Sequence, residues 1–251
     1  MNRQFVAALC VTALVAGALP ARAQQRKPAL PKGLIGISGT FTPTTQTLSA
    51  SASPRVNAET ATISVASDIP SAAGVSASAF VRIWKQLAVG GAFARYQSSS
   101  AAIVSGSIPH PFVFSQPRQF EGTINALNRE ETSMALHAGA MFAPSNRFLI
   151  AVFGGPVRRS LTQDVVTSVS YSEAYPYDTA TLQSTAVSNV KRSAWGFGAG
   201  ADATYFVSRQ VGIGATINFD GGNETLPSIL DSSIESKTGG VHVGVGVRFR
   251  F

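Results

Sequence analysis

The chain has 251 residues, 45% of them apolar, and a mean hydropathy of +0.16, which excludes a disordered or collagen-like protein. Only 13% of the residues are Asp, Glu, Lys or Arg, about half the usual share for a soluble globular protein. No stretch after residue 23 approaches the roughly 20 consecutive apolar residues of a membrane-spanning helix. Two classes remain: a β-barrel in a membrane, or a soluble β protein with unusually few surface charges.

The first 23 residues have the pattern of an export signal. Arg3 supplies the positive start, an apolar run follows from Phe5 to Leu19, and Ala21-Arg22-Ala23 is a small-x-small cleavage site. The alternative is a buried N-terminal helix, but Pro20 and the Ala-x-Ala end suit cleavage better. The sequence therefore predicts a signal peptide over 1–23, cleaved after Ala23.

Cleavage determines which chemistry the mature chain can carry. It removes Cys10, the only cysteine, and so excludes disulfides, thiolate metal sites and a cysteine nucleophile. It also removes two arginines and no acid, which leaves 18 basic against 13 acidic residues, a net charge of +5. These charges are not concentrated on one face, so no nucleic-acid partner is expected. Residues 24–32 are predicted to form a short periplasmic N-terminal segment.

Eight segments alternate between apolar and small or polar residues with period two, which is typical of strands with one apolar face. In chain order they are 33–42, 75–84, 87–96, 132–142, a segment from 148 onward, 196–205, 211–219 and 241–251. The last is the most regular, because every odd residue from Val241 to Phe251 is apolar.

Short and long connections alternate strictly between these segments. The long ones are 43–71, 97–131, 163–193 and 220–237. Compact soluble domains rarely carry so many long loops, whereas outer-membrane barrels combine short periplasmic turns with long extracellular loops. The predicted fold is all-β: an eight-stranded antiparallel up-and-down transmembrane β-barrel over 33–251, with short periplasmic turns and long extracellular loops.

The two faces of these strands favour a membrane barrel over a soluble one. The bulky apolar face is nearly free of charge and should meet lipid, while the opposite face is mainly Gly, Ala, Ser and Thr and should line a narrow lumen. Two aromatic girdles are expected near the strand ends. Their members are Trp84, Phe142, Phe148, Tyr205, Phe249 and Phe251 on the short-turn side, and Phe41, Phe93, Tyr96, Trp195 and Phe219 toward the long loops. The alternative is a soluble sandwich in which these aromatics are core residues.

One segment departs from the strand pattern. Gly154-Gly155-Pro156 interrupts the fifth strand, and proline cannot donate a hydrogen bond to a β-ladder. We expect a bulge near the outer rim.

A signal peptide, eight alternating strands and a terminal Val-Arg-Phe-Arg-Phe together resemble the small outer-membrane β-barrel family of Gram-negative bacteria. The resemblance implies a place in the cell outer membrane, in contact with its lipid. It also implies that Val247, Phe249 and Phe251 form the signal read by the barrel assembly machinery. We expect a monomer.

The polar residues on the inward face show no catalytic pattern. His137 and His242 lack the following hydroxyl of a His-x-Ser arrangement, and the period-two glycines have no helix after them, so no catalytic residue, metal or cofactor is predicted. Arg82, Asp202 and Arg248 should form a lumen charge cluster, in which Asp202 pairs with Arg82 or with Arg248 because a buried unpaired carboxylate is costly. The alternative is that lumen water hydrates each charge.

Two loop segments, 108–114 and 172–178, are rich in aromatic residues and proline. His110, Phe112, Phe114, Tyr175 and Tyr177 are candidates for a recognition surface. Alternatively, these aromatics fold over the barrel mouth or extend the strands above the membrane. The functional hypothesis is a non-enzymatic outer-membrane barrel for surface interaction, adhesion or envelope integrity, with an unidentified extracellular ligand. The alternatives are a narrow pore for small solutes and a lipid-modifying membrane enzyme.

Overall fold

The computed structural model describes residues 30–43, 45–227 and 233–251. The predicted signal peptide and residues 24–29 of the predicted N-terminal segment lie outside this range. The described residues form twelve β-strands. Among these residues, no helix is long and apolar enough to cross a membrane.

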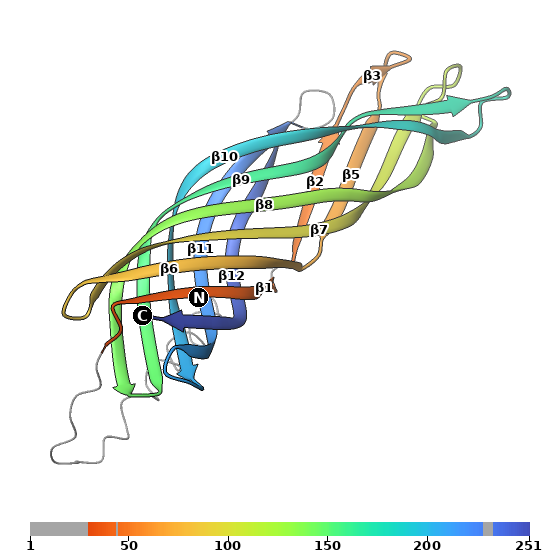
Figure 1. Cartoon of the computed structure of the whole chain (residues 1–251). Helices are drawn as coiled ribbons and strands as arrows, with labels where there is room; N and C mark the ends of the chain where they lie inside the picture. Colours follow the sequence, from red (N-terminus) through yellow and green to blue (C-terminus); the bar gives the residue numbers. More distant parts are fainter. Residues whose placement is uncertain (1–29, 44, 228–232) are drawn as a thin grey trace, which may run out of the picture.

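Eight of the strands close into an antiparallel barrel, which confirms the predicted strand number and fold (Figure 1). Neighbours in the ring follow the order β7-β6-β1-β12-β11-β10-β9-β8, and β8 pairs with β7 to complete it. Their bounds are β1 Gly33–Thr42, β6 Ala72–Trp84, β7 Leu87–Pro109, β8 Pro117–Ser145, β9 Phe148–Glu173, β10 Ala180–Phe206, β11 Val211–Pro227 and β12 Ser233–Arg250.

The two chain ends meet at the β1–β12 seam. Eight residue pairs, from Leu34 opposite Arg250 to Phe41 opposite Val243, join the first and last strands. The seam continues into the terminus, where the Phe251 amide donates to the Gly33 carbonyl at 3.2 Å. A closed ring has no free edge, so every strand of the barrel is paired on both sides.

The expectation of long structureless loops is wrong, because most of those residues form strands. β7 and β8 run on together to a hairpin at 110–116, and β9 and β10 run on to another at 174–179. The 43–71 link holds four further strands: β2 Gln46–Ala52, β3 Arg55–Val56, β4 Glu59–Thr60 and β5 Thr62–Ile69. β5 adds to the upper part of β7, and β2 adds to β5.

These segments build a second region that we call the extension, comprising residues 46–69, 97–130 and 163–195. In it β2-β5-β7-β8-β9-β10 continue beyond the ring as one curled sheet, toward the upper right of Figure 1. The remaining parts of the eight ring strands are called the barrel body. The end of the molecule with the β6–β7, β8–β9 and β10–β11 turns is called the short-turn end.

A β-bulge lies just inside the extension, close to its junction with the barrel body. Where Ser100 and Ala102 of β7 face Leu127 and Ile124 of β8, the pairing register shifts by one residue. Ala126, inside that shift, has a φ of 62°, a left-handed conformation that non-glycine residues seldom adopt. Because one extra residue reverses the side-chain phase, the inward positions of β8 are odd numbers on the barrel side of Ala126 and even numbers beyond it.

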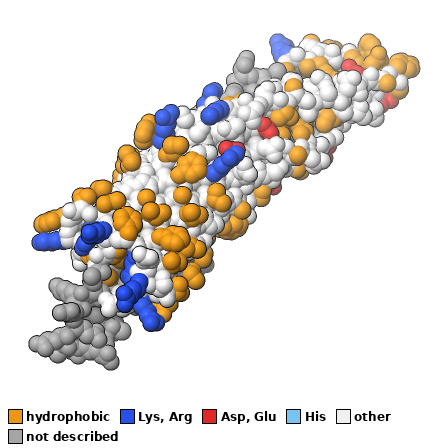
Figure 2. All heavy atoms as spheres, viewed as in Figure 1, with side chains coloured by type: hydrophobic (Ala, Val, Ile, Leu, Met, Phe, Trp, Pro, Cys, Tyr) orange, Lys and Arg blue, Asp and Glu red, His pale blue; other side chains and the backbone are white. Residues whose placement is uncertain are grey.

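The outer face of the barrel body is apolar and exposed. Val245 in the middle of β12 is 64% exposed and Ile37 in the middle of β1 is 61% exposed. Other large apolar side chains that share this face are Ile35, Val75, Val81, Ile83, Leu136, Phe197, Ile213, Ile217, Phe219 and Phe249. Figure 2 shows hydrophobic atoms gathered over the lower half of the molecule and again at its far upper tip.

The sequence predicted an interior lined mainly by small residues, but the lumen of the body departs from this. At the short-turn end bulky apolar side chains fill the lumen, and we call this group the plug: Leu34, Phe80, Ala88, Met141, Leu149, Ala151, Phe153 and Phe206. Tyr96 also corrects the prediction of the upper girdle. Its side chain is only 6% exposed, and its ring stacks on His242 at 4.6 Å between ring centroids.

Pro156 is accommodated in β9 without the predicted bulge near the outer rim. Residues 154–156 pair with 197–199 of β10 in an unbroken register. On the β8 side, pairing stops after Ala135–Val157 and resumes at Ala138–Gly154 in the same register. The missing N–H of proline therefore interrupts the ladder locally without inserting a residue.

The extension has its own hydrophobic core between its curled walls. The buried members are Ala50, Ala61, Ile63, Val65, Ala102, Val104, Ile108, Phe120, Leu127, Val166 and Ala180. Ile108 and Val104 are fully buried, and the Phe120 ring stacks on Tyr171 at 5.9 Å. This core explains why the sheet can leave the ring and remain ordered: its apolar face is covered.

Candidate functional site

Two regions of the described chain combine unusual side chains, namely the polar middle of the lumen and the far tip of the extension. In the lumen, the Arg248 guanidinium forms an ion pair with Asp202, with Nη2 at 2.6 Å and Nε at 2.9 Å from Oδ2. Both side chains are buried, with 2% and 6% of their surfaces exposed. Charge-assisted contacts this short are the strongest hydrogen bonds in proteins.

Arg248, which lies opposite Gly36 in the seam, connects four strands. From β12 it donates to Ser38 Oγ of β1 at 2.8 Å, to Asp202 of β10, and to Thr216 Oγ1 of β11 at 2.5 Å. Thr204 and Thr216 also donate to the two Asp202 oxygens, at 2.7 and 2.6 Å. Every polar atom of Asp202 thus has a partner, which makes its burial tolerable.

Arg82 does not join this cluster. Its guanidinium donates to the Lys85 carbonyl at 3.4 Å, at the β6–β7 turn. The plug lies at this end of the lumen and contains Phe80 from the same strand, so the interior there is apolar. The predicted pairing of Asp202 is met by Arg248, whereas the inclusion of Arg82 in the lumen charge cluster is wrong.

Two inward glycines make room for the arginine. A Cβ atom at Gly36 would come within 2.7 Å of Arg248 Cδ, and one at Gly214 within 2.8 Å of Arg248 Cγ. Small residues at these positions therefore allow a long side chain to lie across the lumen. Sequence reasoning read the glycines only as a narrow lining; their position beside a buried Arg on the same face was the signal for this site.

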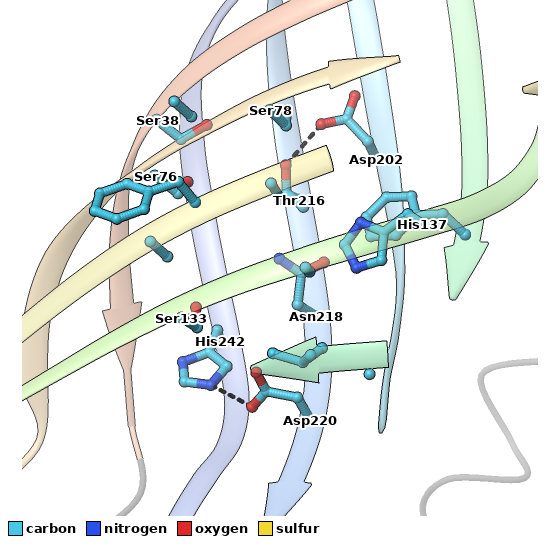
Figure 3. Close-up of a pocket in the computed structure, with 18 of the residues that line it drawn as sticks. Ser38, Ser76, Ser78, Ser133, His137, Asp202, Thr216, Asn218, Asp220 and His242 are labelled. Carbon is cyan, nitrogen blue, oxygen red and sulfur yellow. Dashed lines mark hydrogen bonds and ion pairs between the residues drawn. The ribbon is translucent and has the colours of Figure 1, made fainter. Parts of the chain in front are cut away.

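A second polar group lies farther along the lumen, toward the extension. His242 Nε2 is 2.8 Å from Asp220 Oδ1, and His242 Nδ1 is 2.7 Å from Thr42 Oγ1. Arg159 approaches the other Asp220 oxygen at 3.4 Å. Figure 3 shows Asp220 and His242 beside Asn218 and below His137 in the lumen. Sequence reasoning placed His242 on the inward face but assigned Asp220 to a loop.

The carboxylate, imidazole and hydroxyl of this second group follow the order of a catalytic triad, but their surroundings do not suit catalysis. Thr42 and His242 are buried, and the adjoining cavities have volumes of about 60 and 50 Å³, enough only for water. Among the described residues, no three His, Cys, Asp or Glu side chains form a group that could hold a metal ion.

The far tip of the extension presents aromatic side chains to solvent. Phe112 and Phe114 of the β7–β8 hairpin are 75% and 74% exposed, and Tyr175 of the β9–β10 hairpin is 86% exposed. The two hairpins touch through their rings, since Phe112 and Tyr177 lie 5.5 Å apart in an edge-to-face contact. We call these four residues, together with Val113, the aromatic tip.

His110, which was predicted to belong to the exposed recognition surface, is buried and supports the tip. Only 7% of its surface is exposed, and its Nδ1 accepts hydrogen bonds from the Phe112 and Val113 amides, each at 3.1 Å. His110 therefore shapes the turn that carries Phe112. It would contact a ligand only if that turn opened.

An ion pair connects the two tip hairpins. Arg118 Nη1 of β8 lies 2.5 Å from Glu173 Oε2 of β9, and Arg118 Nη2 donates to the Pro109 carbonyl at 2.9 Å. A third hairpin, β3–β4, joins them, because the Ser115 amide donates to Glu59 Oε1 at 3.0 Å. The aromatic tip is thus held by side chains from three hairpins. Sequence reasoning missed Arg118 and Glu173 because no spacing rule connects them.

The three residues of the expected assembly signal lie on the outer face of the last strand. Val247 is 41% exposed, Phe249 45% and Phe251 59%. Val247 pairs with Ile37 and Phe249 with Ile35, so all three residues lie on the β1–β12 seam or at its end. They are accessible from outside the barrel.

Several solved structures are similar to this chain. No family model and no curated protein matches the chain. The fold is similar to that of Ail, the attachment invasion locus protein of Yersinia pestis, with 12% identity over 88% of this chain and 99% of that one and a TM-score of 0.38. It is also similar to the outer membrane protein OprG of Pseudomonas aeruginosa, with 9% identity over 90% and 99% of the two chains and a TM-score of 0.44. Neisserial surface protein A is similar with 13% identity over 86% and 97% and a TM-score of 0.41.

Proposed function

We propose that this chain is a non-enzymatic barrel of the bacterial outer membrane that uses its extension for interaction at the cell surface. The apolar outer face of the body supports the membrane placement, because an exposed belt of this size on a closed barrel requires a lipid environment. The short-turn end then faces the periplasm and the extension projects outward.

The membrane placement is tested at the last residue. We expect a chain that lacks Phe251 to be exported and to fail in barrel closure, because the Phe251 amide and carbonyl both pair with the Lys32–Gly33 segment. Heat-modifiable migration on a gel and fractionation of the envelope measure this. Recovery of the intact mature chain from the soluble periplasm would contradict the placement.

The observation that carries the surface role is the aromatic tip. Large apolar side chains that are three-quarters exposed are costly in water, and here they gather at the point farthest from the barrel body. Three hairpins hold them in place, so their geometry is prepared before any contact is made. Rigid aromatic side chains of this kind are common at binding hot spots.

Attachment of cells is the direct test. Gram-negative cells that display the parent chain should adhere to epithelial monolayers better than cells that display a Phe112→Ser, Phe114→Ser variant. A matched control is Ile103→Ser, which removes a 51% exposed apolar side chain from the wall of the extension. Equal adherence of all three strains, at equal surface amounts, would remove the basis for the proposal.

The pore alternative is disfavoured by the plug. Leu149, Met141 and Phe206 are 1–2% exposed and block the short-turn end of the lumen. Eight-stranded barrels enclose only enough room for their own side chains. We therefore expect no steady conductance in planar bilayers. Stable channels of porin size would show that the plug opens.

A further inference from the structure

We infer that the partner of the aromatic tip is a lipid bilayer with uncharged or zwitterionic headgroups, which the tip enters from outside the cell. This inference rests on the proposed surface role and names the partner. Three observations lead to it: the chemistry of the tip, the charge around it, and its distance from the barrel body.

The exposed turn 112–114 of the aromatic tip, which we call the apex, has only hydrocarbon side chains. Phe112, Val113 and Phe114 are consecutive, all exposed, and have no polar atom in their side chains. Three backbone amides of this turn already have partners, since the Phe112 and Val113 amides donate to His110 and the Ser115 amide donates to Glu59. Recognition of a sugar or a peptide strand requires free hydrogen-bonding groups, whereas insertion into lipid requires that they be satisfied.

Tyr175 and Tyr177 lie next to this apolar turn, and tyrosine is a residue that suits a membrane interface. The Tyr177 ring lies 5.5 Å from the Phe112 ring, and the Tyr175 ring lies 6.1 Å from the Tyr177 ring. Tyrosine concentrates at the headgroup level of bilayers because its ring is apolar and its hydroxyl is polar. The tip therefore combines exposed phenylalanine with neighbouring tyrosine, a pairing that suits a membrane surface.

The charge around the apex does not favour an anionic surface. The three supporting hairpins carry Arg55 and Arg118 against Glu59, Glu173 and Asp178, a net charge of −1. Arg118 is also committed to the ion pair with Glu173. Membrane attachment through anionic lipid uses clusters of Lys and Arg, which are missing from these three hairpins. Binding should then depend on apolar area and be insensitive to salt.

The reach of the extension makes contact with a second membrane geometrically possible. From Glu130 to Pro117, β8 runs 13 residues beyond the barrel body, about 40 Å of strand at 3.3 Å per residue. The tip is therefore well separated from the bilayer that holds the body. An opposing membrane, rather than the protein's own, is the surface that it meets.

Vesicle flotation tests the inference with the whole protein. The barrel is held in lipid nanodiscs, which cover its own apolar belt, and mixed with phosphatidylcholine vesicles. We expect the parent to float with the vesicles equally well at 0.1 and 1 M NaCl. Each of Phe112→Ser and Phe114→Ser should lower the binding constant about tenfold, and Ile103→Ser should leave it unchanged. Heat-modifiable migration shows that each variant is folded.

A spectroscopic measurement reports the depth of insertion. Phe112→Trp, in a background with Trp84→Phe and Trp195→Phe, should shift its emission to the blue with vesicles and be quenched by lipids brominated on the acyl chains. An unshifted emission, or flotation that requires anionic lipid, overturns the inference. If vesicle binding fails while the Phe112, Phe114 variant still loses adherence, the lipid partner is wrong and the surface role stands. If adherence is also unchanged, both fail.

Discussion

The barrel body and the extension share strands, but the two faces of these strands differ between the regions. The outer face is apolar in the body, whereas the inner face is apolar in the extension. In the body, β7 directs Val89 and Phe93 outward, and its inward positions lie against a lumen with buried charges. In the extension, the same strand directs Ala102, Val104 and Ile108 inward to an apolar core and shows serines to the outside. One continuous β-ladder therefore runs through both regions. Its apolar side chains lie on the outer face in the body and on the inner face in the extension.

The difference shows how a strand adapts to two environments. Side chains alternate faces regardless of surroundings, so either the composition of each face must change or a bulge must shift the phase. This chain uses both. β8 shifts its phase at Ala126, while β7 keeps the same inward phase and changes the residues placed there.

The largest effect is expected from breaking the buried pair of the body. Asp202→Asn and Arg248→Met should each lower the free energy of unfolding by about 3–5 kcal/mol, because each leaves a buried charge without its partner. The double variant should cost less than the sum. Urea titrations followed by heat-modifiable migration measure this, with the exposed Arg209→Met as control. Strict additivity would show that the two charges do not interact.

A truncation in the extension should act locally. Phe120→Ala removes a buried ring that lies over Gly106 and stacks on Tyr171, at a local cost of about 3 kcal/mol. We expect faster proteolysis at the hairpins 110–116 and 174–179 with an unchanged unfolding midpoint of the body. Phe114→Ala, which removes an exposed ring, is the control. A matching loss of stability in the body would mean that the two regions unfold together.

A single lysine on the outer face of each region tests whether that face meets lipid or water. Val245→Lys places an ammonium on the apolar belt and should lower stability in the membrane by about 2–4 kcal/mol. Ser105→Lys places the same group on the outer face of the extension, where it meets water and should have little effect. Folding yield into lipid vesicles provides the measurement. Equal tolerance at both positions would argue against a lipid-facing belt.

The bulge at the junction offers a smaller effect of the opposite sign. Ala126 is exposed and has a φ of 62°, which glycine adopts without strain. Ala126→Gly should raise the local stability of the extension by less than about 1 kcal/mol, and Ala126→Val should lower it. Hydrogen exchange of the β7 and β8 amides near this residue reports the change. Destabilisation by glycine would contradict the left-handed conformation.

The smallest effect concerns pH at the base of the extension. The Arg95 guanidinium, which donates to Glu130 Oε2 at 2.7 Å, lowers the pKa of Glu130 below its ordinary value of 4.5. A lowered carboxyl pKa gives stability that is present above the ordinary value and lost as the pH falls through the lowered one. Both side chains are exposed, so solvent screens the pair. An NMR titration should show a lower Glu130 pKa in the parent than in Arg95→Met.

Prediction from sequence succeeded where one face of a strand had a uniform composition. The eight barrel strands were readable because apolar residues recur at every second position, as in Val241 to Phe251. The extension was read as loops for two physical reasons. Its outer face is rich in serine and threonine, and the bulges near Ala126, Thr167 and Gln183 break the period before it can be recognised.

The candidate sites divide in the same way. The inward phase placed Asp202, Arg248 and His242 in the lumen, and burial cost predicted that the Asp would be paired. The choice of Arg248 over Arg82 depends on how strands tilt and stagger around the ring, which no local pattern encodes. The aromatic segments of the tip were visible as composition, whereas their joining through Arg118 and Glu173 was not.

The sequence by itself determined the number of ring strands, the alternation of inward and outward side chains along them and the apolar outer face, because a period of two is a local property of the backbone. Only the tertiary structure decided that β2 and β5 extend the sheet, that bulky side chains plug the lumen, and that two hairpins bring the rings of Phe112, Tyr175 and Tyr177 together. These features depend on register and closure between strands far apart in the chain, and the energy that selects them arises from contacts that form only when the barrel is complete.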